Sequence, residues 1–196
     1  MTTVSIRIIP TSSLPQVDLD FALGVYMRRF KDYAHAEVSG KVLNLEEFPY
    51  RTTAFGKQYL ADALLQAGLQ QREGDIVVVL TSVDIYTGGT NYIFGLATFG
   101  SALVSSARID PAFWKGIQEI FRYTSEGRPF FERQYAKVLI HELGHAIGLP
   151  HCEDWDCAMR YSNSPMELYR KGEEYCDACW RRFLSNIREM KEDVRT

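Results

Sequence analysis

The sequence predicts a mixed α/β fold, in the broad sense that includes α+β, with a mixed twisted sheet and packed helices in one domain over residues 1–196. Runs typical of strands alternate with runs of helical periodicity up to about residue 150. Residues 76–80, Ile-Val-Val-Val-Leu, form an uninterrupted apolar run, typical of a strand buried on both faces of a sheet. A chain of 196 residues can build one hydrophobic core but not two ordinary domains.

The first half of the chain contains five expected elements. They are a strand at residues 4–9 that stops at Pro10, a helix at 19–30, a strand at 36–45, a helix at 53–69 and the apolar strand at 76–80.

The second half begins with a polar, glycine-rich connection at residues 82–89. Residues 91–99 and 101–109 then form two β-like runs, expected as a hairpin or as adjacent edge strands, with Gly95 and Gly100 within and between them. A long helix is expected at 130–147, ended by Gly148 and Pro150. Residues 151–165 are turn-like and 174–189 form a final helix. We therefore expect an N-terminal subdomain at 1–150 and a small, mostly irregular C-terminal subdomain at 151–196.

The composition narrows the classes of partner. Hydrophobic residues make up 46% and charged residues 24%, as in ordinary soluble globular proteins. A net charge of -3 without a Lys/Arg-rich run argues against a nucleic-acid partner. The N-terminus lacks the basic and apolar segments of a signal peptide, and no apolar stretch reaches the roughly 18 residues of a membrane span. We therefore expect a cytoplasmic protein without a membrane partner.

Residues 141–151 spell HExxHxxGxxH, a signature of zinc peptidases. His141 and His145 lie four apart on the expected helix, so both rings project from one face. Glu142 is rotated by roughly 100° from His141 and lies beside the metal rather than on it. Gly148 permits a sharp turn that returns His151 to the ion. Three histidine ligands leave a fourth position open, the pattern of a catalytic zinc.

This motif predicts peptide-bond hydrolysis by zinc-activated water, with Glu142 as the general base that later passes its proton to the leaving amine. The alternatives are a zinc-containing protein that binds peptides or a partner with little or no turnover, and a structural zinc protein whose motif is vestigial. The intact Glu142 favours hydrolysis, because zinc binding alone requires no carboxylate there. His35, the fourth histidine, has no motif around it and is expected to be structural.

All four cysteines follow the motif, as Cys152, Cys157, Cys176 and Cys179. In a reducing compartment, two pairs of thiols favour a closed Cys₄ zinc site, which is normally structural. Four free thiols or two disulfides remain as alternatives. Because Cys152 adjoins His151, the second metal would anchor the segment that carries the third catalytic ligand. We therefore expect two zinc ions per chain, with the structural site supporting the catalytic one.

Three blocks of sequence together resemble the archaemetzincin family. They are the HExxHxxGxxH run followed at once by Cys152, then Cys157-Ala158-Met159, then Cys176-Asp177-Ala178-Cys179; residues 84–97 are similar as well. The resemblance implies a compact metzincin fold, split by a cleft that takes a peptide or protein substrate.

The resemblance also implies roles for residues around the motif. Met159 would form the Met-turn, an apolar floor under the histidines. Tyr161 would assist the transition state, with a packing role alone as the alternative. An edge strand within residues 93–105 would pair with extended substrate, and residues 160–169 would set specificity. Neither the preferred substrate nor the oligomeric state can be read from the residues.

Overall fold

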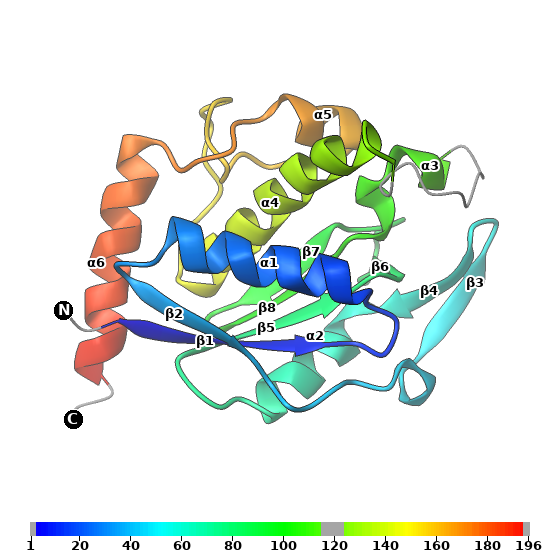
Figure 1. Ribbon diagram of the computed structural model, residues 1–196, viewed down its shortest axis with the longest axis horizontal. Coiled ribbons are helices and arrows are strands. Elements are labelled where there is room, and N and C mark those ends of the chain that lie inside the picture. Colours follow the sequence, from blue (N-terminus) through cyan, green and yellow to red (C-terminus); the bar gives the residue numbers. More distant parts are fainter. Residues whose placement is uncertain (1–2, 115–123, 194–196) are drawn as a thin grey trace.

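The computed structural model describes residues 3–114 and 124–193. Its centre is a five-stranded sheet in the order β2-β1-β5-β8-β7 (Figure 1). Four strands run parallel: β1 (Val4–Pro10), β2 (Ala34–Val38), β5 (Ile76–Thr81) and β8 (Ser101–Ser105). The last, β7 (Gly95–Thr98), pairs antiparallel with β8 and forms one edge of the sheet. The expected hairpin and edge strand are therefore confirmed, as is the mixed sheet.

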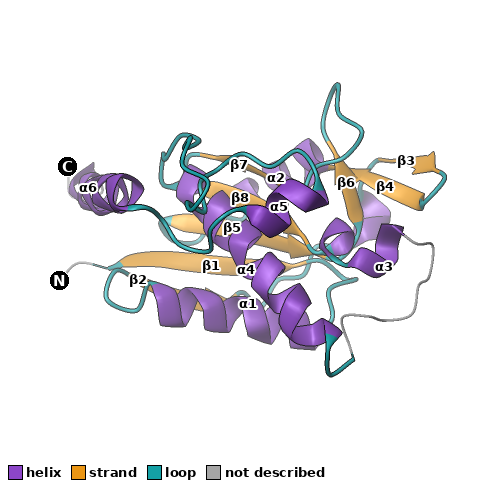
Figure 2. Ribbon diagram, turned by 90° about the horizontal axis from the view of Figure 1, so that it is seen from above, coloured by secondary structure: helices purple, strands orange, loops and turns teal. Residues whose placement is uncertain are grey.

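Helices cover both faces of this sheet. Helices α1 (Gln16–Arg29) and α4 (Gly127–Ala146) pack on one face, and α2 (Ala61–Gln70) packs on the other (Figure 2). Along β5, Ile76, Val78 and Leu80 belong to the first core, whereas Val77 and Val79 belong to the second. Every residue of β5 is buried, which confirms the prediction from its apolar run.

The predicted helix at residues 53–69 is wrong in its first half. Residues 50–60 form a hairpin of β3 (Tyr50–Thr53) and β4 (Gly56–Leu60), and the helix begins only at Ala61. Gly56, with φ +99°, permits the tight turn between these strands. The buried Gln58 side chain donates to Asp84 on β6 (Asp84–Tyr86), the third strand of this small sheet. Tertiary pairing thus overrides a fortuitous helical spacing of apolar residues.

Other elements also differ from expectation in their bounds. The second strand ends at Val38 instead of continuing to residue 45; beyond it, Leu43 makes a single bridge to Thr11, and Leu45–Glu47 form a 3₁₀ turn, η1. The connection at residues 82–89 contains the short strand β6. After β8 come a second 3₁₀ turn, η2 (Ala107–Ile109), and the short helix α3 (Pro111–Trp114).

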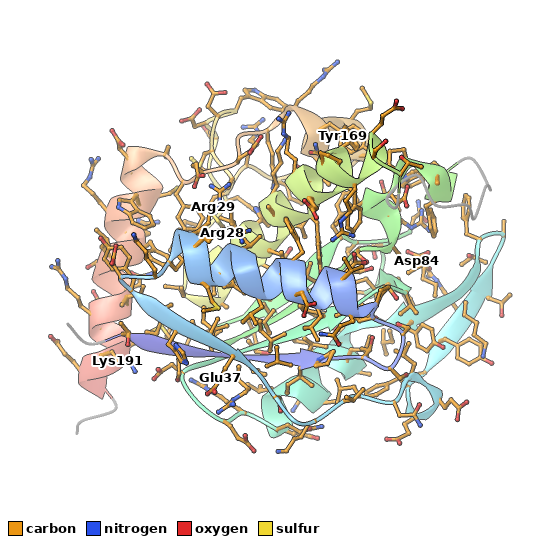
Figure 3. All side chains as sticks on the ribbon, viewed as in Figure 1. Arg28, Arg29, Glu37, Asp84, Tyr169 and Lys191 are labelled. Atoms are coloured by element: carbon orange, nitrogen blue, oxygen red, sulfur yellow. The ribbon has the colours of Figure 1, made fainter. Side chains whose placement is uncertain are left out.

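The C-terminal part begins with an irregular segment and ends, as expected, in a helix, α6 (Asp177–Asp193). Helix α5 (Pro165–Arg170) was not expected, although Ser164 caps it by accepting from the Glu167 N–H and proline follows at its first turn. Helix α6, which carries Lys191 (Figure 3), packs near β1. The Lys191 ammonium lies 2.5 Å from a carboxylate oxygen of Asp75. Among the described residues, no helix is long and apolar enough to cross a membrane.

Candidate active site

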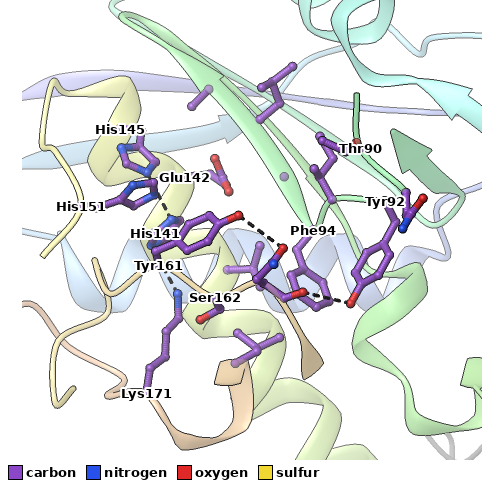
Figure 4. A pocket seen from close by; sticks show the side chains of 18 of the residues that line it. Thr90, Tyr92, Phe94, His141, Glu142, His145, His151, Tyr161, Ser162 and Lys171 are labelled. Atoms are coloured by element: carbon purple, nitrogen blue, oxygen red, sulfur yellow. Dashed lines mark hydrogen bonds between the residues drawn. The ribbon is translucent and has the colours of Figure 1, made fainter. Parts of the chain in front are cut away.

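Helix α4 places two histidines and a glutamate beneath the edge of the sheet. The residues expected on its buried side are indeed buried, namely Phe131, Tyr135, Val138, Leu139, Leu143 and Ala146. The same helix turns His141 and His145 toward one point, so that their Nε2 atoms lie 3.2 Å apart. Two imidazole nitrogens are thereby presented together on one side of the helix (Figure 4).

A glycine turn brings the third histidine to the other two. Gly148, directly after the helix, has φ +89°, a conformation that glycine adopts without steric strain. The Leu149 N–H donates to the Gly144 carbonyl, which closes the turn. The ring of His151 then lies 4.6 Å from that of His145, centroid to centroid. One ligand atom from each of the three histidines lies within 4.8 Å of the others.

Backbone carbonyls orient two of the rings. The Nδ1 atoms of His141 and His145 lie 2.8 Å from the carbonyl oxygens of Ala158 and Leu149. Such a hydrogen bond places the imidazole proton on Nδ1, so the lone pair of Nε2 is available to bind a metal. Burial lowers the pKa of all three histidines below the ordinary value, most strongly for His141. Neutral imidazoles are the form that binds a metal, so this donor set fits a zinc ion.

Glu142 lies buried between α4 and the edge strand β7. Burial raises the pKa of its carboxyl to about 8, and the positive charge of Lys171 opposes that rise. Glycine at position 95 is required for this packing. A Cβ atom there would lie 2.5 Å from Glu142 Cγ and 2.6 Å from Oε1. At Gly95 the backbone of β7 therefore packs directly against the Glu142 carboxylate, with no side chain between them.

Replacing Gly95 with alanine is expected to displace the Glu142 carboxylate and to lower kcat for the peptide hydrolysis that the motif predicts by about tenfold or more, without changing the metal content. Steady-state kinetics with metal analysis would measure this. Gly88→Ala is the matched control, because a Cβ there meets nothing within 4 Å. Equal activity of Gly95→Ala and wild type would contradict the proposed contact.

Met159 forms an apolar floor beneath the histidines. Its side chain is fully buried, and a Cβ atom on Gly144, between His141 and His145, would overlap its sulfur. The small residue inside the motif thus allows Met159 to pack directly against the helix. The Tyr175 hydroxyl packs beside this contact and donates to the Ile140 carbonyl. The position of Met159 agrees with the Met-turn implied by the sequence resemblance.

The four cysteines form a second cluster. One sulfur from each of Cys152, Cys157, Cys176 and Cys179 lies within 4.8 Å of the others. The Sγ atoms of Cys152 and Cys176 are 3.9 Å apart, far beyond the roughly 2.05 Å of a disulfide bond. All four thiols are free. Burial raises the pKa of Cys157 and Cys179, so ionising these thiols requires a nearby positive charge, which a metal ion supplies. This donor set fits a tetrahedral zinc site.

The backbone of Ala158 and Met159 connects the histidine cluster to the cysteine cluster. Its Ala158 carbonyl accepts from His141, and its Met159 carbonyl accepts from the Cys152 N–H at 3.0 Å. On the other side, the Ala158 N–H donates to the Glu174 carbonyl at 2.7 Å. The cysteine cluster therefore supports both His141, through Ala158, and His151, through the adjacent Cys152.

A cleft with a volume of about 680 Å³ contains the histidines. One wall is the edge strand β7 with the segment before it, and the opposite wall comes from residues 161–171. Tyr161 lies on that second wall, with its ring 5.0 Å from the ring of His151 and more than half of its surface exposed. His35 lies exposed on β2, outside both clusters.

Sequence reasoning missed Lys171 in this cleft. Its side chain is only 4% exposed, and its Nζ lies 3.3 Å from His141 Nδ1. The ammonium donates to the Arg160 carbonyl at 3.2 Å. In the sequence Arg170-Lys171-Gly172-Glu173-Glu174, this lysine looks like part of a solvated charged surface. Lys171 reaches the histidines only because the chain folds back beneath α4.

The fold, the convergent histidines and the adjacent glutamate define a zinc metallopeptidase of the metzincin class. The model of peptidase family M54 matches residues 57–186. An archaemetzincin of Nanoarchaeum equitans is 32% identical over 157 residues, which cover 80% of this chain and 79% of that relative. An archaemetzincin of Methanopyrus kandleri is 38% identical over 136 residues, which cover 67% of this chain and 69% of that relative.

A crystal structure of archaemetzincin from Methanopyrus kandleri superimposes with a TM-score of 0.71 at 28% identity, covering 95% of this chain and 96% of that one. The chain therefore belongs to the archaemetzincins, peptidase family M54. It is a zinc-dependent metallopeptidase that hydrolyses peptide bonds, and the resemblance inferred from its motifs is confirmed.

Proposed function

We propose that the protein holds two zinc ions, a catalytic ion on His141, His145 and His151 and a structural ion on the four cysteines. The convergence of three neutral histidine nitrogens beside a buried carboxylate carries the catalytic assignment. The structural assignment is supported by the sulfur cluster, whose four donors leave no position open. The free thiols suit a reducing compartment, so we also propose that the protein is cytoplasmic.

A zinc ion on the histidines would supply Lewis-acid polarisation of the substrate carbonyl and would make water more acidic. Glu142 would accept the proton of the attacking water at its carboxylate and deliver it to the leaving amide nitrogen. Burial alone raises the pKa of this carboxyl, and the charge of a zinc ion on the histidines would lower that pKa, so that Glu142 stays ionised until it accepts the proton. Tyr161, beside His151, would donate a hydrogen bond to the oxyanion.

The substrate is a peptide or protein, and we propose that an extended segment of it pairs with β7. This strand is an edge of the sheet, lines the cleft and approaches Glu142 through Gly95. Main-chain hydrogen bonds to such an edge fix the direction of a peptide without selecting its side chains. Side-chain selection would then depend on the opposite wall of the cleft, residues 161–171.

The test is digestion of an unbiased peptide library by the wild type, with Glu142→Ala purified in parallel. We expect the wild type alone to cut, phenanthroline to abolish cutting and added zinc to restore it. Metal analysis should give two zinc ions per chain. Equal cutting by both preparations would show contamination by another peptidase. A failure of the wild type to cut across the whole library would favour a peptide-binding role for the same cleft.

A further inference from the structure

We use the name recess for the part of the cleft that is lined by Val138, Ser162, Leu168 and Lys171, where Figure 4 shows Ser162 and Lys171 near His141. Val138 on α4 and Leu168 on α5 provide apolar sides. Lys171 and Ser162 provide the polar groups that line the same cavity. None of these four residues is a proposed zinc ligand or the proposed general base. The recess adjoins the histidines, since Lys171 contacts His141 directly.

Lys171 is buried and forms no ion pair with a described residue; the charge of Glu142 acts on it only from beyond ion-pairing distance. No carboxylate of the described chain lies within ion-pairing distance, 4.0 Å, of its Nζ, although the side chain is only 4% exposed. The described residues that line the cleft include one other charged side chain, Glu142. Removing an ammonium group from water without an opposite charge is unfavourable, so such a group is seldom retained without a ligand or a pairing role.

The hydrogen bonds of Lys171 leave donors available. The ammonium has three protons, and the Arg160 carbonyl accepts one of them. His141 Nδ1 is close, but its own proton is donated to the Ala158 carbonyl at 2.8 Å, so this nitrogen cannot also accept from Lys171. A second buried lysine provides the contrast. Lys137 donates to the carbonyls of both Leu168 and Tyr169 and does not line the cleft.

Ser162 supplies a second donor in the same recess. Its hydroxyl oxygen is buried and has no hydrogen-bond partner within the described chain. Buried hydroxyl groups are normally satisfied, so an unpaired one lining a substrate cleft points to a ligand atom that completes its bonding. An ammonium and a hydroxyl that line one recess suit a carboxylate, which accepts from several donors at once.

We propose that Lys171 and Ser162 form a carboxylate-binding subsite, so that the enzyme prefers peptides with a carboxylate next to the cleaved bond. This inference rests on the proposed function. The carboxylate comes either from an Asp or Glu side chain or from the C-terminus of a short peptide. Both present the same anionic group to Lys171, and the apolar sides formed by Val138 and Leu168 accommodate the methylene groups that carry it.

Binding can be measured without turnover, in zinc-loaded Glu142→Ala protein. The probes are peptides that place Glu or its isosteric amide Gln at each position around one fixed sequence, each with a free or an amidated C-terminus. We expect one Glu position, or the free C-terminus, to bind about 10- to 100-fold more tightly than its neutral partner, as charged hydrogen bonds typically provide. The Glu series and the C-terminal series distinguish the two sources of carboxylate.

Lys171→Met in the same background should reduce this acid-to-amide ratio to near one while binding of the neutral peptides persists. Ser162→Ala should reduce the ratio by a smaller factor. Lys137→Met is the matched control, because it also removes a buried lysine near α5 and should retain the ratio. Zinc content and melting temperature of each variant show that the fold is intact.

Three results separate the two proposals. Equal binding of acidic and neutral peptides by the parent protein would overturn the carboxylate subsite, even if the wild type hydrolyses peptides. A preference that persists in Lys171→Met would overturn the role of this lysine. Tight acidic binding without any hydrolysis by the wild type would support the subsite and count against the proposed catalysis. Ratios of kcat/KM in the Glu142-containing enzyme should follow the binding ratios if both proposals hold.

Discussion

Replacing Glu142 with glutamine is expected to lower kcat/KM for peptide hydrolysis by about 10³-fold or more, with both zinc ions retained. Glutamine has nearly the same shape but cannot accept and return the proton, and general acid–base catalysis typically contributes about 10²- to 10⁴-fold. Glu142 is buried, and among the described residues that line the cleft it is the only acidic one. No other carboxylate there can therefore take over as the base.

The measurement is steady-state hydrolysis of a peptide identified from the library, together with zinc analysis of both proteins. Affinity for uncleaved peptides should remain within a few-fold of the wild type, because glutamine preserves the packing against Gly95. Loss of the catalytic zinc in Glu142→Gln would mean that the residue acts as a ligand or holds one in place. Retained activity would mean that a group other than Glu142 is the general base.

Replacing Cys176 with serine is expected to remove the structural zinc and to weaken the catalytic site as well. Structural zinc sites contribute folding free energy directly, so we expect the melting temperature to fall by roughly 10 °C or more. The catalytic zinc should dissociate about tenfold more readily, the lower end of the loss usual when groups supporting metal ligands are disturbed. The path for this effect is the backbone of Cys152, Ala158 and Met159, which bonds to or adjoins the histidines.

Competition with a chelating dye would measure zinc affinity at each site, and calorimetry would give the melting temperature. Asp177→Asn is the control, because it changes the neighbouring exposed residue on α6 and leaves all four sulfurs in place. If Cys176→Ser binds one zinc with wild-type affinity and keeps full activity, the two sites are independent.

The sequence predicts the parts of this protein whose cause is local. The uninterrupted apolar run in β5 predicts a strand buried on both faces, and the helical spacing of apolar residues in α4 predicts a helix with one buried side. The turn at Gly148 was expected because few other residues tolerate its backbone conformation. The convergence of the histidines followed from the same reasoning, since His141 and His145 lie four apart on one helix and His151 follows that turn.

Features that depend on distant segments were harder to predict. The hairpin at residues 50–60 is held by pairing with β6 and by Gln58 bonding to Asp84, neither of which the apolar spacing reveals. Lys171 resembles a surface residue until the chain folds it beneath His141. Helix α5 had a local signal, since Ser164 is a typical N-cap and precedes a proline, but its six residues are few for periodicity to detect.

The order of the proposed metal ligands along the chain has a consequence for synthesis of the protein on the ribosome. Helix α4 can form before residues 151–179 emerge, yet His141 depends on Ala158 and the cluster beside His151 depends on Cys179. Domains generally form from the N-terminus as synthesis proceeds. A nascent chain with two of its histidines already in place therefore still lacks the residues that orient and complete the triad. The proposed catalytic centre can therefore be completed only after residues 151–179 have been synthesised.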